Sequence, residues 1–140
     1  MTVSDVLLAL VVLVSITFFL LGLKSQKGSA KGVKDGKLAP CSSAPNAVCS
    51  EADTQPEKEV ATLQTSMAKA KAAVIATGGT ITAETDSYVS ATYMSRLFKF
   101  VDDVELRADG DIVHIRSASR VGYSDRGVNR KRVEAIRAAL

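Results

Sequence analysis

The sequence predicts an α+β protein in which an N-terminal transmembrane helix precedes a small two-layer domain. Two patterns indicate this fold class: an uncharged apolar run near the start of the chain, and alternating apolar and polar runs between two helical patterns further on. We expect residues 1–23 to be the anchor, residues 24–53 a linker and residues 54–140 the domain. A chain of 140 residues divided in this way is too short for most two-domain enzymes and for a multi-span transporter.

The apolar run extends from Val6 to Leu23 and reads VLLALVVLVSITFFLLGL. At about 1.5 Å per residue, a helix of this length spans roughly 27 Å, close to the hydrocarbon thickness of a thin bilayer. A cleaved signal peptide is the alternative, but it needs a basic start and a small-residue cleavage site. Because the chain begins MTVSD and Lys24 follows the run directly, we expect an uncleaved, single-pass integral membrane helix.

The segment after the anchor is basic and rich in glycine, serine and proline, which predicts a flexible linker. An excess of lysine on one side of a span marks the cytoplasmic side, so we expect the domain on the cytoplasmic or stromal side. Each lysine close to anionic lipid adds about 1 kcal/mol of attraction; alternatively, the lysines only keep a solvated linker soluble. The five are Lys24, Lys27, Lys31, Lys34 and Lys37.

Two cysteines, Cys41 and Cys49, lie in the last part of the linker. They either close a small disulfide loop in an oxidising compartment or remain two thiols in a reducing one. No metal site is expected, because the single histidine is far away in sequence and a zinc site needs three or four ligands. No cofactor is expected either.

The domain is predicted to begin with a helix of about five turns. It starts at the capping box Thr54-Gln-Pro-Glu57 and ends at Gly78-Gly79. An antiparallel sheet of about four strands follows, and a C-terminal helix capped by Ser124 or Asp125 ends the chain. The strand-like runs are TITAET, SYVSATYMSR, FKFVDDVELR and DIVHIRSAS.

The last two strands are predicted to form a hairpin, because Asp109-Gly110 is a strong signal for a two-residue turn. Setting Ala108 opposite Asp111 places apolar side chains together on one face of the hairpin. We expect that face to pack on the core. The opposite face is then a ladder of charged residues, and we expect it to lie on the surface.

Charges on the hairpin are predicted to be structural rather than catalytic. Asp102 and Asp103 are adjacent and point to opposite faces, so they do not form a catalytic pair of carboxylates. Asp102 lies on the core face and needs partners, for which Ser117 and an incoming arginine are candidates. The surface pairs expected on the other face are Asp103 with Arg116 and Glu105 with His114.

Arginines gather in sequence near the start of the last helix, where free amide groups and the helix dipole favour an anion. The candidate anion-binding residues are Arg120, Arg126, Arg130, Asn129 and Tyr123. The alternative is that these arginines neutralise nearby aspartates. Nucleic acid is not expected as a partner, because a net charge of +3 on a mixed surface is weak for that purpose.

The run FKFVDDVEL…VHIRSASRVGYSDRGVNRKRVEAIR resembles the signature of an uncharacterised family, domain of unknown function fourteen ninety-nine, found in bacteria and plastid-bearing eukaryotes. With a Cys-Ser-Ser-x-Pro-Asn-like element upstream, the resemblance covers roughly residues 40–140. It implies a bacterial inner membrane or a thylakoid or other organellar membrane, and it implies no reaction. The family tends to place its second cysteine directly after Pro-Asn, where this chain has Ala47.

No catalytic constellation is evident, so we expect a non-catalytic accessory or scaffold protein. Such a protein would be a small subunit of a larger membrane complex and would contact other subunits through its transmembrane helix. The alternative is a membrane-tethered module that binds an anionic small molecule or lipid headgroup through the arginines. An enzyme would need a pocket that joins Asp102, Tyr123 and Asn129.

Overall fold

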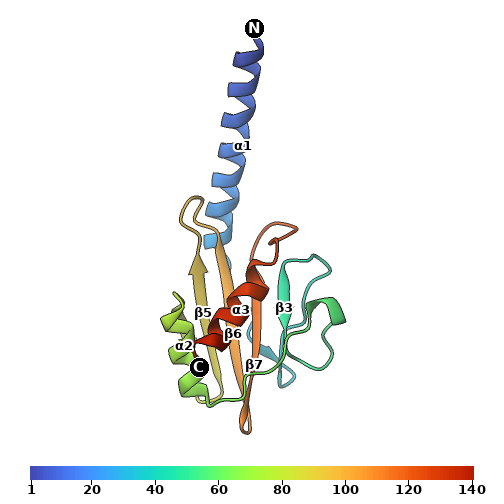
Figure 1. The fold of residues 1–140 in the computed structure, drawn as a ribbon, viewed down its shortest axis with the longest axis vertical. Helices are drawn as coiled ribbons and strands as arrows, with labels where there is room; N and C mark the ends of the chain where they lie inside the picture. The colour runs from blue at the N-terminus through green and yellow to red at the C-terminus, as the bar shows by residue number, and fades with distance from the viewer.

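A computed structural model describes all 140 residues and confirms the α+β fold. Helix α1 (Val3–Gln26) stands out from a domain in which helices α2 and α3 cover one face of a sheet (Figure 1). The five antiparallel strands have the order β3-β7-β6-β5-β4. The other helices are α2 (Met67–Ala76) and α3 (Val128–Ala138), and the strands are β3 (Ala47–Cys49), β4 (Thr80–Glu84), β5 (Tyr88–Met94), β6 (Val101–Asp109) and β7 (Ile112–Ser119).

Helix α1 is long and apolar enough to cross a membrane. The Thr2 side chain caps its start by accepting a hydrogen bond from the Asp5 amide. Two polar side chains within the apolar run, Ser15 and Thr17, donate to backbone carbonyls one turn earlier. The helix therefore satisfies its own polar groups, as a segment in hydrocarbon must.

The core lies between the sheet and helices α2 and α3. It comprises fourteen buried apolar residues in one cluster, to which the central strands contribute Val104, Leu106, Val113 and Ile115. The predicted core face of the hairpin is therefore correct.

The predicted helix from Thr54 to Gly78 is wrong in its first half. That half contains only a short 3₁₀ turn (Pro56–Lys58), and an extended segment then leads to α2. Leu63 in this segment exchanges two backbone hydrogen bonds of 2.9 Å with Val113 and is fully buried. The apolar residues of this segment thus reach the core from an extended chain, not from a helix. The helix α2 begins only after Ser66, whose side chain caps it by accepting from the Lys69 amide.

The hairpin register differs from the prediction by two residues. The turn is formed by Gly110 and Asp111, so Asp109 faces Ile112. Gly110 has a φ of +59°, which a glycine at the first central position of a two-residue turn adopts at little cost. A shift of two leaves every side chain on its predicted face but changes its partner. Glu105 therefore faces Arg116, and not His114.

Nearly all of the predicted linker belongs to the folded unit. Strand β3 pairs with β7 at the edge of the sheet, and a two-stranded ribbon, β1 (Val33–Lys34) with β2 (Lys37–Leu38), precedes it. Leu38 and Cys49 are buried. Residues 25–53 thus pack on the domain, and in particular on the sheet face that α2 and α3 leave open.

Replacing Ser66 tests the corrected start of α2. The Ser66→Ala variant loses the cap, so we expect its free energy of unfolding in detergent solution to fall by about 1 kcal/mol. Ser66→Asp keeps a side-chain acceptor and should unfold like the wild type in urea. Equal stability of the alanine variant and the wild type would contradict this helix start.

Candidate functional site

The hairpin face predicted to be a surface ladder is instead buried. Its charged side chains come from β6 and β7 and lie beneath residues 25–53. Glu105 is 0%, Arg116 3% and Asp103 4% exposed. We call the following residues the charged face: Asp103, Glu105, Arg107, His114 and Arg116. Burying charges in this way is costly unless each one is paired and hydrogen-bonded.

Glu105 lies at the centre of the charged face. Its carboxylate accepts from Arg116 Nη1 at 3.0 Å, from the Tyr88 hydroxyl at 2.7 Å and from the Gly32 amide at 2.6 Å. Burial raises the pKa of Tyr88, and its hydrogen bond to Glu105 raises that pKa further. This phenol therefore stays protonated and acts as a donor, and the Gly32 amide ties the former linker to the sheet.

Asp103 connects the sheet to α1. Arg120 donates to both carboxylate oxygens of Asp103 at 2.7 Å, and its Nη1 donates to the Ser25 carbonyl at 3.1 Å. The hydroxyl of Ser25 accepts from the Val101 amide at 3.0 Å. Hydrogen bonding to Asp103 raises the pKa of Arg120, so the guanidinium stays charged. We call these four residues, Ser25, Val101, Asp103 and Arg120, the anchor clamp.

Glu51, from the segment after β3, forms the third buried ion pair, with Arg107 of the charged face. Arg107 donates to its two oxygens at 2.9 and 3.0 Å, and the Leu38 amide donates to it at 3.0 Å. Burial opposes ionisation, but the bonds from Arg107 and Leu38 outweigh it and hold the pKa of Glu51 below its usual value. Neither Glu51 nor Arg107 is among the residues expected from the sequence, because Glu51 lies in the predicted linker and the predicted hairpin register gives β6 the wrong partners.

His114 lies near a serine and an acid. Its Nδ1 is 3.3 Å from Ser50 Oγ, and its Nε2 is 3.6 Å from a carboxylate oxygen of Asp109. These residue types form catalytic triads elsewhere. Here the Ser50 hydroxyl accepts from the Ile115 amide at 2.8 Å, and five cavities of the protein are lined by neither Ser50 nor His114. The arrangement serves to join the segment after β3 to β7.

Asp102, on the core face, has an arginine partner as predicted. Arg132 of α3 donates to its carboxylate at 2.7 Å. Ser117, the other predicted partner, instead donates to Asn129 at 2.6 Å. The Asn129 amide in turn donates to the Asn46 carbonyl at 3.0 Å. Asn129 is fully buried and joins α3, β7 and the segment before β3, so its role here is structural.

The predicted anion-binding residues do not come together. Arg120 is engaged in the anchor clamp, and Arg130 donates to the carbonyls of Glu57 and Glu59. Arg126 and Tyr123 are exposed in the loop before α3. The structure therefore presents no shared anion site for these side chains.

Both cysteines are free thiols, so the disulfide alternative is not formed. Burial raises the pKa of Cys41 and of Cys49. Thiols of this kind are protonated at neutral pH and are weak nucleophiles.

Replacing Arg116 tests whether its ion pair with Glu105 stabilises the buried charged face. Arg116→Met leaves a buried carboxylate without its cation, so we expect the free energy of unfolding to fall by about 3–5 kcal/mol. In the double variant with Glu105→Gln, the amide oxygen still accepts from Tyr88 and Gly32 while the charge is gone, and much of the loss should be recovered. A double variant no more stable than Arg116→Met would contradict this pairing.

The depressed pKa of Glu51 predicts a pH dependence. A carboxyl whose pKa is lowered by folding contributes stability above its ordinary value of 4.5 and loses it as the pH falls through the folded pKa. Glu51→Gln should therefore be less stable than the wild type at neutral pH, and the difference should shrink below pH 4.5. Urea unfolding across this range measures it, with Asp53→Asn as the control at an exposed acid. A difference independent of pH would contradict the assignment.

The comparisons with known proteins support a folded unit that begins before residue 54. A sequence model of the family described as "Protein of unknown function (DUF1499)" matches residues 37–140. A search of curated proteins finds no match. The matched region begins within the predicted linker and includes Glu51, β3 and the whole hairpin. Because it covers well over half of the sequence, the chain belongs to the DUF1499 family of proteins of unknown function.

Proposed function

We propose that this protein is a single-pass, membrane-anchored and non-catalytic accessory subunit of a larger membrane complex. The observation that carries the proposal is the surface of α1. All its large apolar side chains except Leu21 are exposed, while its last turn is bonded into the domain. An apolar surface of this extent needs lipid or a partner protein to cover it.

Contacts at the base of α1 favour a retained anchor over a removed signal sequence. The ring of Phe18 stacks on Phe98 at 5.3 Å, and Gly22 lies so close to the Phe98 carbonyl that any larger residue would overlap it. Ser25 completes the anchor clamp. Cleavage after the apolar run would remove Phe18 and Gly22, and with them the contacts that hold Phe98 against the helix.

The polar groups of the domain favour a structural role over catalysis. The acids of the charged face, together with Asp102, are held by arginines from within the same chain. The alternative function, anion binding, loses its basis because Arg120 and Arg130 are engaged by other groups. The exposed surface of α1 is then the part most suited to bind other membrane subunits.

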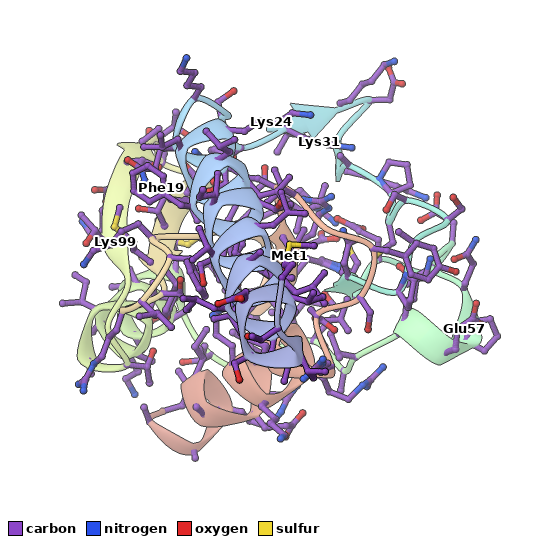
Figure 2. All side chains as sticks on the ribbon, turned by 90° about the horizontal axis from the view of Figure 1, so that it is seen from above. Met1, Phe19, Lys24, Lys31, Glu57 and Lys99 are labelled. Carbon is purple, nitrogen blue, oxygen red and sulfur yellow. The ribbon has the colours of Figure 1, made fainter.

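The charge around α1 supports a domain on the cytoplasmic or stromal side. Lys24 lies in the last turn of α1 and Lys27 directly follows it, and lysines next to a membrane span are typical of its cytoplasmic side. Seen along α1, Lys31 lies on the same side of its base as Lys24 (Figure 2). Lys34 and Lys37 belong to the β1–β2 ribbon, well below α1 in Figure 1, so contact with anionic lipid is proposed for the first three lysines.

Purification from native membranes tests the proposal. The full chain, tagged at its C-terminus, should stay in membranes after carbonate extraction, and its intact mass should include residues 1–23. In mild detergent it should elute as a complex with other membrane proteins. A control in which an unrelated apolar helix replaces residues 3–17, which keeps Phe18 and Gly22, should remain in membranes but lose these partners. A cleaved soluble protein, or a free monomer for both chains, would contradict the proposal.

A further inference from the structure

Two loops form the end of the domain that faces the membrane helix. One joins β5 to β6 (residues 95–100) and the other joins β7 to α3 (residues 120–127). They rise on either side of the lower part of α1 (Figure 1). In the view along α1, Lys99 of the first loop lies on one side of the helix and the second loop on the other (Figure 2). We call them the rim loops.

The first rim loop reaches past the level at which the apolar run of α1 ends. Phe18 precedes Leu23, the last apolar residue, by five positions, which corresponds to about 7–8 Å along the helix. Helix side chains also lean toward the N-terminus. Because Phe98 stacks on Phe18 at 5.3 Å, its ring lies at a depth where α1 itself is in hydrocarbon.

Hydrogen bonds and ring contacts hold the first rim loop at this depth. The Ser95 amide donates to the Phe100 carbonyl at 2.8 Å, and the Phe100 amide donates to Ser95 Oγ at 2.9 Å. Phe100 packs edge-on against Phe18, with ring centroids 6.1 Å apart. The absence of a side chain at Gly22 admits the Phe98 carbonyl against the helix. The loop is therefore held at this height by α1 and does not reach it by chance fluctuation.

Large apolar side chains project from both rim loops. Leu97 is 79% and Tyr123 76% exposed, and Met94, just before the first loop, is also exposed. Between the loops and α1 lies a cavity of about 270 Å³. Its apolar wall consists of Phe18, Leu21, Phe100, Val121 and Val128. Apolar groups gathered at this level mark a surface that water does not cover well.

The charge of the rim loops suits an anionic membrane surface. Their exposed charged side chains are all cationic: Arg96, Lys99 and Arg126. The single acid in these loops, Asp125, accepts hydrogen bonds from the amides of Gly127 and Asn129, and these bonds, against the effect of burial, lower its pKa. Basic residues beside leucine and tyrosine are typical of segments that lie in the interface of a bilayer.

We propose that both rim loops insert into the interface of the anionic leaflet from which α1 emerges. The protein then has a second membrane contact, fixed to the first by the anchor clamp, and the domain is held upright beneath the bilayer. This inference rests on the proposed function, because it takes α1 to span the membrane. The rim loops are covered by lipid. If a protein covered them instead, the fluorescence test would give a different result.

Tryptophan fluorescence in vesicles tests the proposal directly, because the chain contains no tryptophan. The full-length variants Leu97→Trp and Tyr123→Trp report on the two rim loops. Leu13→Trp reports on the anchor, and Asp111→Trp reports on the turn between β6 and β7, at the opposite end of the domain (Figure 1). All four positions are exposed, so the fold should tolerate the changes. Each variant is placed in vesicles of phosphatidylcholine and phosphatidylglycerol with or without brominated acyl chains.

We expect brominated lipid to reduce the fluorescence of the Leu13, Leu97 and Tyr123 variants severalfold and to leave that of the Asp111 variant unchanged. If the Leu13 variant is quenched and either rim variant is not, the inference is overturned, while the proposal that α1 spans the membrane still holds. The same result is expected if the loops bind a protein instead of lipid. Quenching of the Asp111 variant to the same degree would overturn it too, because the far end of the domain would then touch the bilayer. An unquenched Leu13 variant would overturn the proposed function and this inference together.

Discussion

The ion pair between Asp103 and Arg120 is the interaction on which the rest of the structure depends. Asp103 and Glu105 lie on the face of the β6–β7 hairpin opposite the core, and each is almost completely buried. A buried carboxylate is stable only with a cation and hydrogen bonds around it. Residues 25–53 supply the cover and part of the bonding, and Arg120 extends the Asp103 pair to the Ser25 carbonyl. The requirement to satisfy these acids thus turns a glycine-rich segment into part of the domain.

This constraint fixes the orientation of the domain relative to α1. A flexible linker would let the domain turn freely relative to α1, whereas the anchor clamp sets its orientation. The same connection places Phe98 against Phe18 and so brings the first rim loop to the level of the apolar run of α1. The orientation of the domain relative to α1 is therefore a consequence of burying charge on the sheet.

The fold class, the apolar helix and the core face of the hairpin could be predicted, because each depends on a repeating local pattern. The hairpin register could not, since Asp109-Gly110 and Gly110-Asp111 are both plausible turns and a shift of two preserves the faces. The extended segment around Leu63 was mistaken for helix, because its apolar residues reach the core at spacings that a helix also produces. The buried charges were missed, since nothing local shows what covers a sheet face. One feature of the sequence does indicate that the linker is part of the domain: the family resemblance begins near residue 40, inside the predicted linker.

Amide hydrogen exchange of the full chain in lipid nanodiscs tests the central claim most directly. The amides of Val101 and Gly32 donate to Ser25 Oγ and to Glu105, respectively, across the junction between α1 and the sheet. If residues 25–53 are part of the domain, both amides should exchange as slowly as the neighbouring strands β6 and β7. Exchange of Gly32 at the rate of unstructured chain, with β6 and β7 protected, would contradict the account.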